Sequence, residues 1–103
     1  MKIILFTRTT EEVARHAIKS YPGWQARSYE WGCHEKSAPV IVLISTPLER
    51  RNFEMSDAYK FLKKRGDNTF TVIYAASVDS VRTKYPYETY NQWLDRAVTE
   101  SGL

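Results

Sequence analysis

Ala38-Pro39-Val40-Ile41-Val42-Leu43-Ile44 is the longest apolar run in the chain. A short, continuous apolar run rich in β-branched residues is typical of a strand that is buried on both faces. Residues 2–7, which include Ile3-Ile4-Leu5-Phe6, show the same pattern. The two runs therefore predict two strands in the interior of a sheet, and such a sheet needs a cover on both sides.

A helix signal follows each of these runs. Thr9 and Glu12, and again Thr46 and Glu49, have the spacing of a capping box, in which the threonine side chain caps a helix N-terminus. Pro47 stands at the first helical position, where its missing N–H does no harm. The sequence therefore predicts one helix beginning after Thr9 and another beginning after Thr46.

The remaining elements complete a simple order. The helix after Thr46 ends at Gly66, a residue typical of helix C-caps, and it either runs unbroken or restarts at the potential cap Ser56. Residues 24–31 and 69–76 predict two further strands, and residues 86–101 predict a third helix. The expected order is strand, helix, strand, strand, helix, strand, helix.

The short connection between residues 31 and 38 decides between two architectures. A parallel crossover usually takes a dozen or more residues and a helix. The connection is shorter, so it predicts an antiparallel hairpin of residues 24–31 and 38–44. We therefore expect an α+β sandwich with a ferredoxin-like βαββαβ core, both core helices on one face, and an added C-terminal helix. The alternative is a small three-layer α/β fold. Either the helix over residues 86–101 or a second copy of the chain, in a homodimer, should cover the other face.

Composition places the chain in a broad class. Its 103 residues are 43% hydrophobic and 26% charged, which predicts a single folded domain over residues 1–103. The single cysteine, Cys33, cannot form an internal disulfide. No apolar run approaches the roughly 20 residues of a membrane-spanning helix. We therefore expect a cytoplasmic protein without a membrane partner.

Motifs for catalysis and metal binding are absent from the sequence. Cys33-His34-Glu35 is the only local set with a thiol, a base and a carboxylate. Neighbours on an extended segment point in opposite directions, so these three are not expected to contact one another. The sequence favours a protein without catalytic residues, cofactor or metal, and it leaves open whether Cys33 or His34 has a chemical role.

Aromatic residues beside arginines indicate a protein interface, because Tyr, Trp and Arg are enriched at interface hot spots. Part of this aromatic set belongs to the core, since Tyr90 lies on the apolar stripe of the predicted last helix. The interface candidates are Tyr29, Trp31, Arg82, Tyr85, Tyr87 and Trp93.

Basic residues suggest a second kind of partner. Hydroxyls and arginines beside helix N-termini can bind an anion, but ordinary helix capping predicts the same enrichment. The hairpin topology puts the junctions after residues 2–7 and 38–44 at opposite edges of the sheet, where they cannot form one pocket. The candidates for binding nucleic acid or an anion are Arg8, Arg50, Arg51, Lys60, Lys63 and Lys64.

These patterns favour a small, non-enzymatic regulatory or inhibitory protein that acts through protein–protein contacts. Aromatic-rich domains of this size without a catalytic motif are typical of accessory proteins encoded by phages and mobile elements. The alternative is a nucleic-acid-binding or nuclease-like domain that uses a basic helix face. Its net charge of +3 is small for a dedicated nucleic-acid binder.

Overall fold

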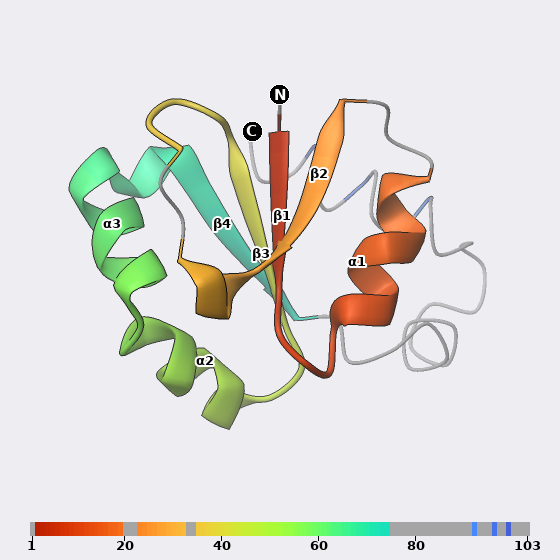
Figure 1. Cartoon of the computed structure of the whole chain (residues 1–103), viewed down its shortest axis with the longest axis horizontal. Coiled ribbons are helices and arrows are strands. Elements are labelled where there is room, and N and C mark those ends of the chain that lie inside the picture. The colour runs from red at the N-terminus through yellow and green to blue at the C-terminus, as the bar shows by residue number, and fades with distance from the viewer. Residues whose placement is uncertain are drawn as a thin grey trace.

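The computed structural model describes residues 2–19, 23–32 and 35–74, together with Gln92, Arg96 and Thr99. The elements follow one another as β1 (Lys2–Phe6), α1 (Glu11–Ile18), β2 (Trp24–Ser28), the 3₁₀ turn η1 (Tyr29–Trp31), β3 (Val40–Ile44), α2 (Pro47–Glu54), α3 (Asp57–Arg65), the 3₁₀ turn η2 (Asp67–Thr69) and β4 (Phe70–Tyr74) (Figure 1). Within the helix predicted over residues 86–101, Gln92, Arg96 and Thr99 are helical and exposed, and its other positions lie outside the described residues.

The sheet is parallel throughout, with the strand order β2-β1-β3-β4. Ile4 of β1 is in register with Ala26 of β2 and with Ile41 of β3. The predicted antiparallel hairpin of β2 and β3 is therefore wrong, because both strands pair with β1 and neither pairs with the other. The general α/β class is confirmed, but a sheet with only parallel pairs does not match the expected ferredoxin-like arrangement.

The hairpin prediction is wrong because β2 ends earlier than the sequence indicated. The strand stops at Ser28, whose hydroxyl accepts a hydrogen bond from Glu30 N at 3.3 Å and so begins the turn η1. Residues 29–39 are then available for the crossover, and they span up to about 36 Å when extended. Passing β1 takes about 10 Å, and returning along the strand takes about 17 Å. The connection is therefore long enough to reach the start of β3 without an α-helix, and the turn η1 is the regular element among its described residues.

Arg65 at the end of α3 holds this crossover in place. Its guanidinium donates to the carbonyl oxygen of Glu35 at 2.8 Å and to the carbonyl oxygen of Ala38. A guanidinium presents several N–H donors in a rigid fork, so one side chain can hold two backbone positions. Arg65 therefore belongs to the fold, although it directly follows the basic candidates Lys63 and Lys64 in the sequence.

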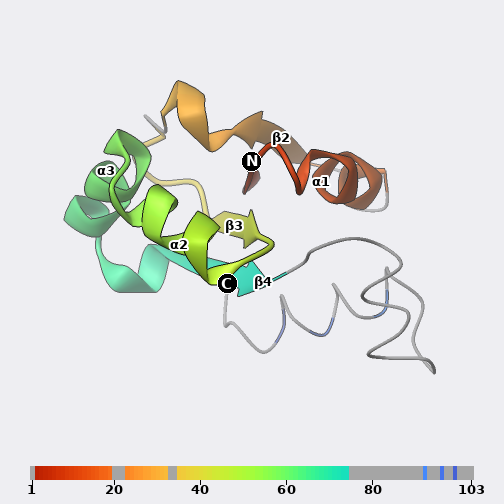
Figure 2. The same ribbon diagram turned by 90° about the horizontal axis from the view of Figure 1, so that it is seen from below.

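Helices cover both faces of the sheet, as Figure 2 shows from below. Ile4, Phe6, Ile41 and Leu43 pack against α1, whose buried residues are Val13, Ala14 and Ala17. The expected double cover of the two apolar strands is confirmed, but α2 and α3 supply the second cover, which was expected from the helix over residues 86–101 or from a second copy of the chain. The expectation that the first two helices share one face is wrong, and the arrangement agrees with the three-layer alternative.

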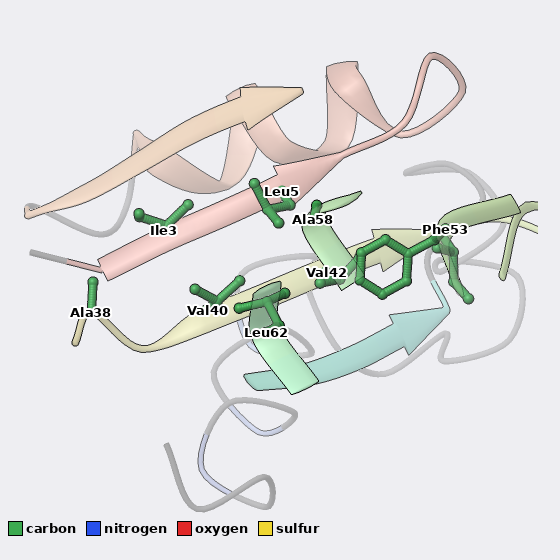
Figure 3. Packing of buried hydrophobic residues seen from close by; sticks show 9 residues of the cluster. Ile3, Leu5, Ala38, Val40, Val42, Phe53, Ala58 and Leu62 are labelled. Atoms are coloured by element: carbon green, nitrogen blue, oxygen red, sulfur yellow. The ribbon is translucent and has the colours of Figure 1, made fainter. Parts of the chain in front are cut away.

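The second face carries the larger cluster of buried residues. Phe53 of α2, with Ala58 and Leu62 of α3, packs on Ile3, Leu5, Val40 and Val42 of the central strands (Figure 3). Ser56 separates α2 from α3, and its hydroxyl accepts a hydrogen bond from Tyr59 N at 3.3 Å. The helix thus restarts at Ser56, which the sequence left undecided.

Candidate functional site

The loops that follow β1 and β3 meet at the carboxyl edge of the sheet. β1 and β3 are parallel neighbours, so both strands end at the same edge. The hydroxyl oxygens of Thr9 and Ser45, one from each loop, lie 2.8 Å apart. The expectation that these junctions lie at opposite edges is therefore wrong. Open parallel sheets usually bind ligands at this kind of position, where the chain turns from one side of β1 to the other.

Glu49 of α2 fills the position between the two loops with its own carboxylate. Its Oε1 accepts hydrogen bonds from the Thr7 hydroxyl at 2.9 Å and from Ser45 N at 2.8 Å. Its Oε2 accepts from the Thr9 hydroxyl. The Ser45 side chain also hydrogen-bonds with Glu49. The hydroxyl and amide donors of both loops thus converge on one carboxylate.

The hydrogen bonds set the charge state of Glu49. Burial raises the pKa of its carboxyl, but the bonds from Thr9, Ser45 and Thr7 outweigh burial and hold the pKa below its ordinary value. An ionised carboxylate in this position repels a second anion. The cluster therefore links two loops, and its negative charge disfavours an anion at the position between them.

The threonines and glutamates of the two predicted capping boxes do not all make the hydrogen bonds that a capping box implies. Thr46 caps α2 as predicted, because its hydroxyl accepts from Glu49 N at 3.1 Å. The Glu49 side chain, however, reaches Ser45 N and the β1 loop. α1 begins after Thr10 and not after Thr9, and no side chain caps it. The Thr10 hydroxyl instead accepts from Thr7 N and donates to the carbonyl oxygen of Leu43 at 3.0 Å.

An open groove of about 510 Å³ lies beside this cluster, between α1 and the ends of β1 and β2. We call it the Arg8 groove. Three arginines and two glutamates supply its charges, and Phe6, Ala26 and Trp31 supply its apolar surface. The lining residues are Phe6, Arg8, Glu11, Arg15, Ala26, Arg27, Ser28, Glu30 and Trp31.

The arginines of the groove differ in how firmly they are held. The Arg15 guanidinium lies 5.5 Å from the Phe6 ring centroid and 3.6 Å from the Glu11 carboxylate. Arg27 donates to the side-chain oxygen of Gln25 at 2.7 Å and lies 3.4 Å from Glu35. Arg8 is exposed and forms no ion pair with another described residue. Arg8 therefore keeps its donors for solvent or a partner.

Trp31 is the most exposed large apolar side chain among the described residues, at 85%. It lines the Arg8 groove, and it also lines a second hollow of about 170 Å³ with Ser56 and Ala58 of the α3 region. Tyr29, the other interface candidate in this segment, is half-buried and packs edge-on against Phe53 with ring centroids 5.8 Å apart. Of the two aromatics, Trp31 presents its ring to solvent and Tyr29 supports the core.

The basic candidates do not gather with Arg8. Arg50 pairs with Glu54 at 3.3 Å, and Lys63 pairs with Asp67 at 2.7 Å. These two cations line a separate hollow of about 320 Å³ beside β4. Arg51, Lys60 and Lys64 are exposed and form no ion pair with another described residue.

Several predicted candidates lie outside the described residues: Cys33, His34, Arg82, Tyr85, Tyr87 and Trp93. Within residues 2–19, 23–32 and 35–74 and the three helical positions near the C-terminus, no group of three or more His, Cys, Asp or Glu side chains is arranged to hold a metal ion. None of the described helices is both long and apolar enough to cross a membrane.

Comparison of the chain with protein-family models, curated proteins and solved structures finds no match. The structural class of this protein therefore rests on its topology alone: it is an α/β protein with an open parallel sheet. Sequence reasoning missed Arg15, Arg27 and Glu49 as parts of the carboxyl edge. The alternation of Gln25, Arg27 and Tyr29 was the available signal for Arg27, and nothing local identified Glu49 as the link to β1.

Proposed function

We propose that this chain is a non-enzymatic regulatory or inhibitory protein that binds another protein through Trp31 and the Arg8 groove. The observation that carries the proposal is Trp31, which is 85% exposed at the rim of a groove lined by three arginines. A tryptophan buries about 150–250 Å² when it packs fully. The same proposal places the chain in the cytoplasm, since it contains a single cysteine.

Trp31 has the properties of an interface anchor. It lines two hollows and is 85% exposed, so a partner surface can contact it together with residues of either hollow. Truncation of such an anchor commonly costs about 2 kcal/mol or more of binding free energy, which is roughly a thirtyfold loss of affinity. The arginines around it add directional hydrogen-bond donors, which fix the orientation of a partner.

Affinity capture from extract of the source cells tests this proposal. The tagged wild-type chain and the variants Trp31→Ala and Leu48→Ala are compared in nuclease-treated extract, with bound proteins identified by mass spectrometry. Leu48 is a matched control, because it is a large apolar residue, 63% exposed, on α2. We expect one stoichiometric protein that the wild type and Leu48→Ala retain and Trp31→Ala loses. Equal recovery by all three chains would overturn the proposal.

A second candidate function is nucleic-acid binding through Arg51, Lys60 and Lys64. These side chains are exposed on α2 and α3, without an ion pair to another described residue, and can contact phosphates by counterion release. The double variant Lys60→Glu/Lys64→Glu tests it. Nucleic acid recovered with the wild type, and lost with the double variant, would favour this function over a protein partner.

A further inference from the structure

We propose that the Arg8 groove receives an acidic segment of the partner protein, with a carboxylate on Arg8 and a neighbouring apolar side chain against Trp31. This inference rests on the proposed function and names the chemistry of the partner. It follows from the charges, the hydrogen-bond donors and the apolar surface that line the groove.

Arg8 is the arginine of the groove that has no ion-pair partner among the described residues. Arg15 lies 3.6 Å from Glu11, and Arg27 lies 3.4 Å from Glu35, which stands outside the lining. An acidic side chain from a partner would give Arg8 a counter-ion.

The three arginines of the lining also bring more hydrogen-bond donors to the groove than its two glutamates bring acceptors. Each guanidinium carries five N–H groups in a planar fork that matches the two oxygens of a carboxylate. In the described residues, Arg27 uses one nitrogen on Gln25 and one on Glu35, whereas Arg8 uses none on another side chain. A bidentate contact with a carboxylate is the arrangement that satisfies Arg8 most fully.

Two of the three arginines are already held in place before a partner arrives. Arg15 rests over the Phe6 ring, and Arg27 is tied to Gln25 and Glu35. A preorganised side chain loses less conformational freedom on binding, so more of its interaction energy remains as affinity. Arg8 differs from both, because none of its donors is used on another described side chain, so the loss of Arg8 should remove the contact with the acidic group most directly.

Trp31 determines where an apolar side chain of the partner segment can bind. Phe6 is buried and its ring is covered by Arg15, so the groove floor offers little open aromatic surface. The exposed indole of Trp31 at the rim is the remaining large apolar face. A segment in which an acidic residue neighbours an aromatic or aliphatic residue can reach Arg8 and Trp31 together.

Selection from a random displayed peptide library tests this chemistry without a known partner. We expect peptides selected on the wild-type chain to be enriched in Asp or Glu next to an apolar residue. Fluorescence anisotropy of the selected peptides should show binding that weakens as salt is raised. Arg8→Ala should weaken it about tenfold, the effect of losing a charge-assisted hydrogen bond.

Lys19→Ala is the matched control, because Lys19 is an exposed cation at the C-terminal end of α1 outside the Arg8 groove. It should bind the selected peptides as the wild type does. The inference is overturned if no peptides are selected, if they lack acidic residues, or if Arg8→Ala binds them unchanged. A captured partner that requires Trp31 but tolerates Arg8→Ala would leave the proposed function standing and refute this inference alone.

Discussion

At the scale of single residues, Glu49 connects parts of the chain that are far apart in sequence. Its carboxylate receives the Thr7 and Thr9 hydroxyls from the β1 loop and Ser45 N from the β3 loop. In an open parallel sheet this is the usual place for a ligand. Here the chain's own side chain occupies it, and the open groove lies to one side, against α1 and β2.

Replacing Glu49 by glutamine should lower the free energy of unfolding by about 1.5–3 kcal/mol at neutral pH, the value of a hydrogen bond to a charged group. The folded-state pKa of Glu49 lies below its ordinary value, so its contribution is fully present above the unfolded pKa of about 4.3. This contribution disappears as pH falls through the folded pKa. Urea unfolding of both proteins across this pH range checks the prediction.

Glu54→Gln is the control for Glu49→Gln on the same helix. Glu54 forms an exposed ion pair with Arg50, and such pairs contribute about 0.2–1 kcal/mol. We expect a smaller loss of stability than for Glu49→Gln. A Glu49→Gln protein that stays as stable as wild type at neutral pH would show that the carboxylate does not hold the two loops together.

Arg65, like Glu49, connects parts of the chain that are far apart in sequence. Its two hydrogen bonds to the Glu35 and Ala38 carbonyl oxygens fix the crossover between β2 and β3. Arg65→Met should lower the free energy of unfolding by about 2–3 kcal/mol, because it removes charge-assisted bonds to backbone. Arg65→Lys should recover part of this at most, since an ammonium group lacks the planar fork. Thermal and urea unfolding measure both variants.

Lys64→Met is the matched control for Arg65, because it removes a neighbouring exposed cation on α3. Exposed substitutions of this kind usually stay within about 0.5 kcal/mol of wild type. If Arg65→Met and Lys64→Met were equally stable, the crossover would have to be held by other contacts.

At the scale of elements, one aromatic side chain joins η1, α2 and α3. Phe53 of α2 is fully buried. Its ring meets the edges of Tyr29 of η1 at 5.8 Å and Tyr59 of α3 at 5.5 Å, measured between ring centroids. The short helices α2 and α3 are therefore held against the sheet by packing at this ring more than by their own length.

Phe53→Ala should lower the free energy of unfolding by about 3–5 kcal/mol, the usual cost of removing a buried aromatic ring. Met55→Ala, two positions away at the end of α2, removes a side chain that is 79% exposed and should change stability little. Near-ultraviolet circular dichroism of Phe53→Ala should also lose the part of the signal that comes from Tyr29 and Tyr59. A small change in both measurements would mean that the three elements are anchored elsewhere.

At the scale of the whole molecule, stability is concentrated in the two central strands. Every residue of β3 is buried, and so is β1 beyond Lys2, whereas the edge strands β2 and β4 are half-buried or exposed. The backbone hydrogen bonds of β1 and β3 break only when the sheet opens as a unit, whereas edge strands can open locally.

Amide hydrogen exchange should therefore be slowest in β1 and β3 and faster in β2 and β4. Measurement residue by residue in the native protein checks this order directly. Slow exchange shared by β2 and β3, with β1 exchanging faster, would instead indicate that β2 and β3 are direct neighbours and would contradict the parallel order β2-β1-β3-β4.

Local sequence patterns determined the elements and the burial of the central strands. The apolar runs at residues 2–7 and 38–44 required cover on both faces, and the structure supplies it with α1 on one side and α2 and α3 on the other. Thr46 and Pro47 marked the start of α2 because a helix N-terminus needs an oxygen acceptor and tolerates proline there.

Only the tertiary structure decided the direction of the strands and the assembly of the carboxyl edge. The predicted hairpin failed because a difference of three residues at the end of β2, which stops at Ser28, frees enough chain for a parallel crossover. Once β1 and β3 run parallel, Thr9, Ser45 and Glu49 meet across long sequence separations. Periodicity and capping report each residue's near neighbours, whereas strand order and these contacts depend on the packing of distant segments.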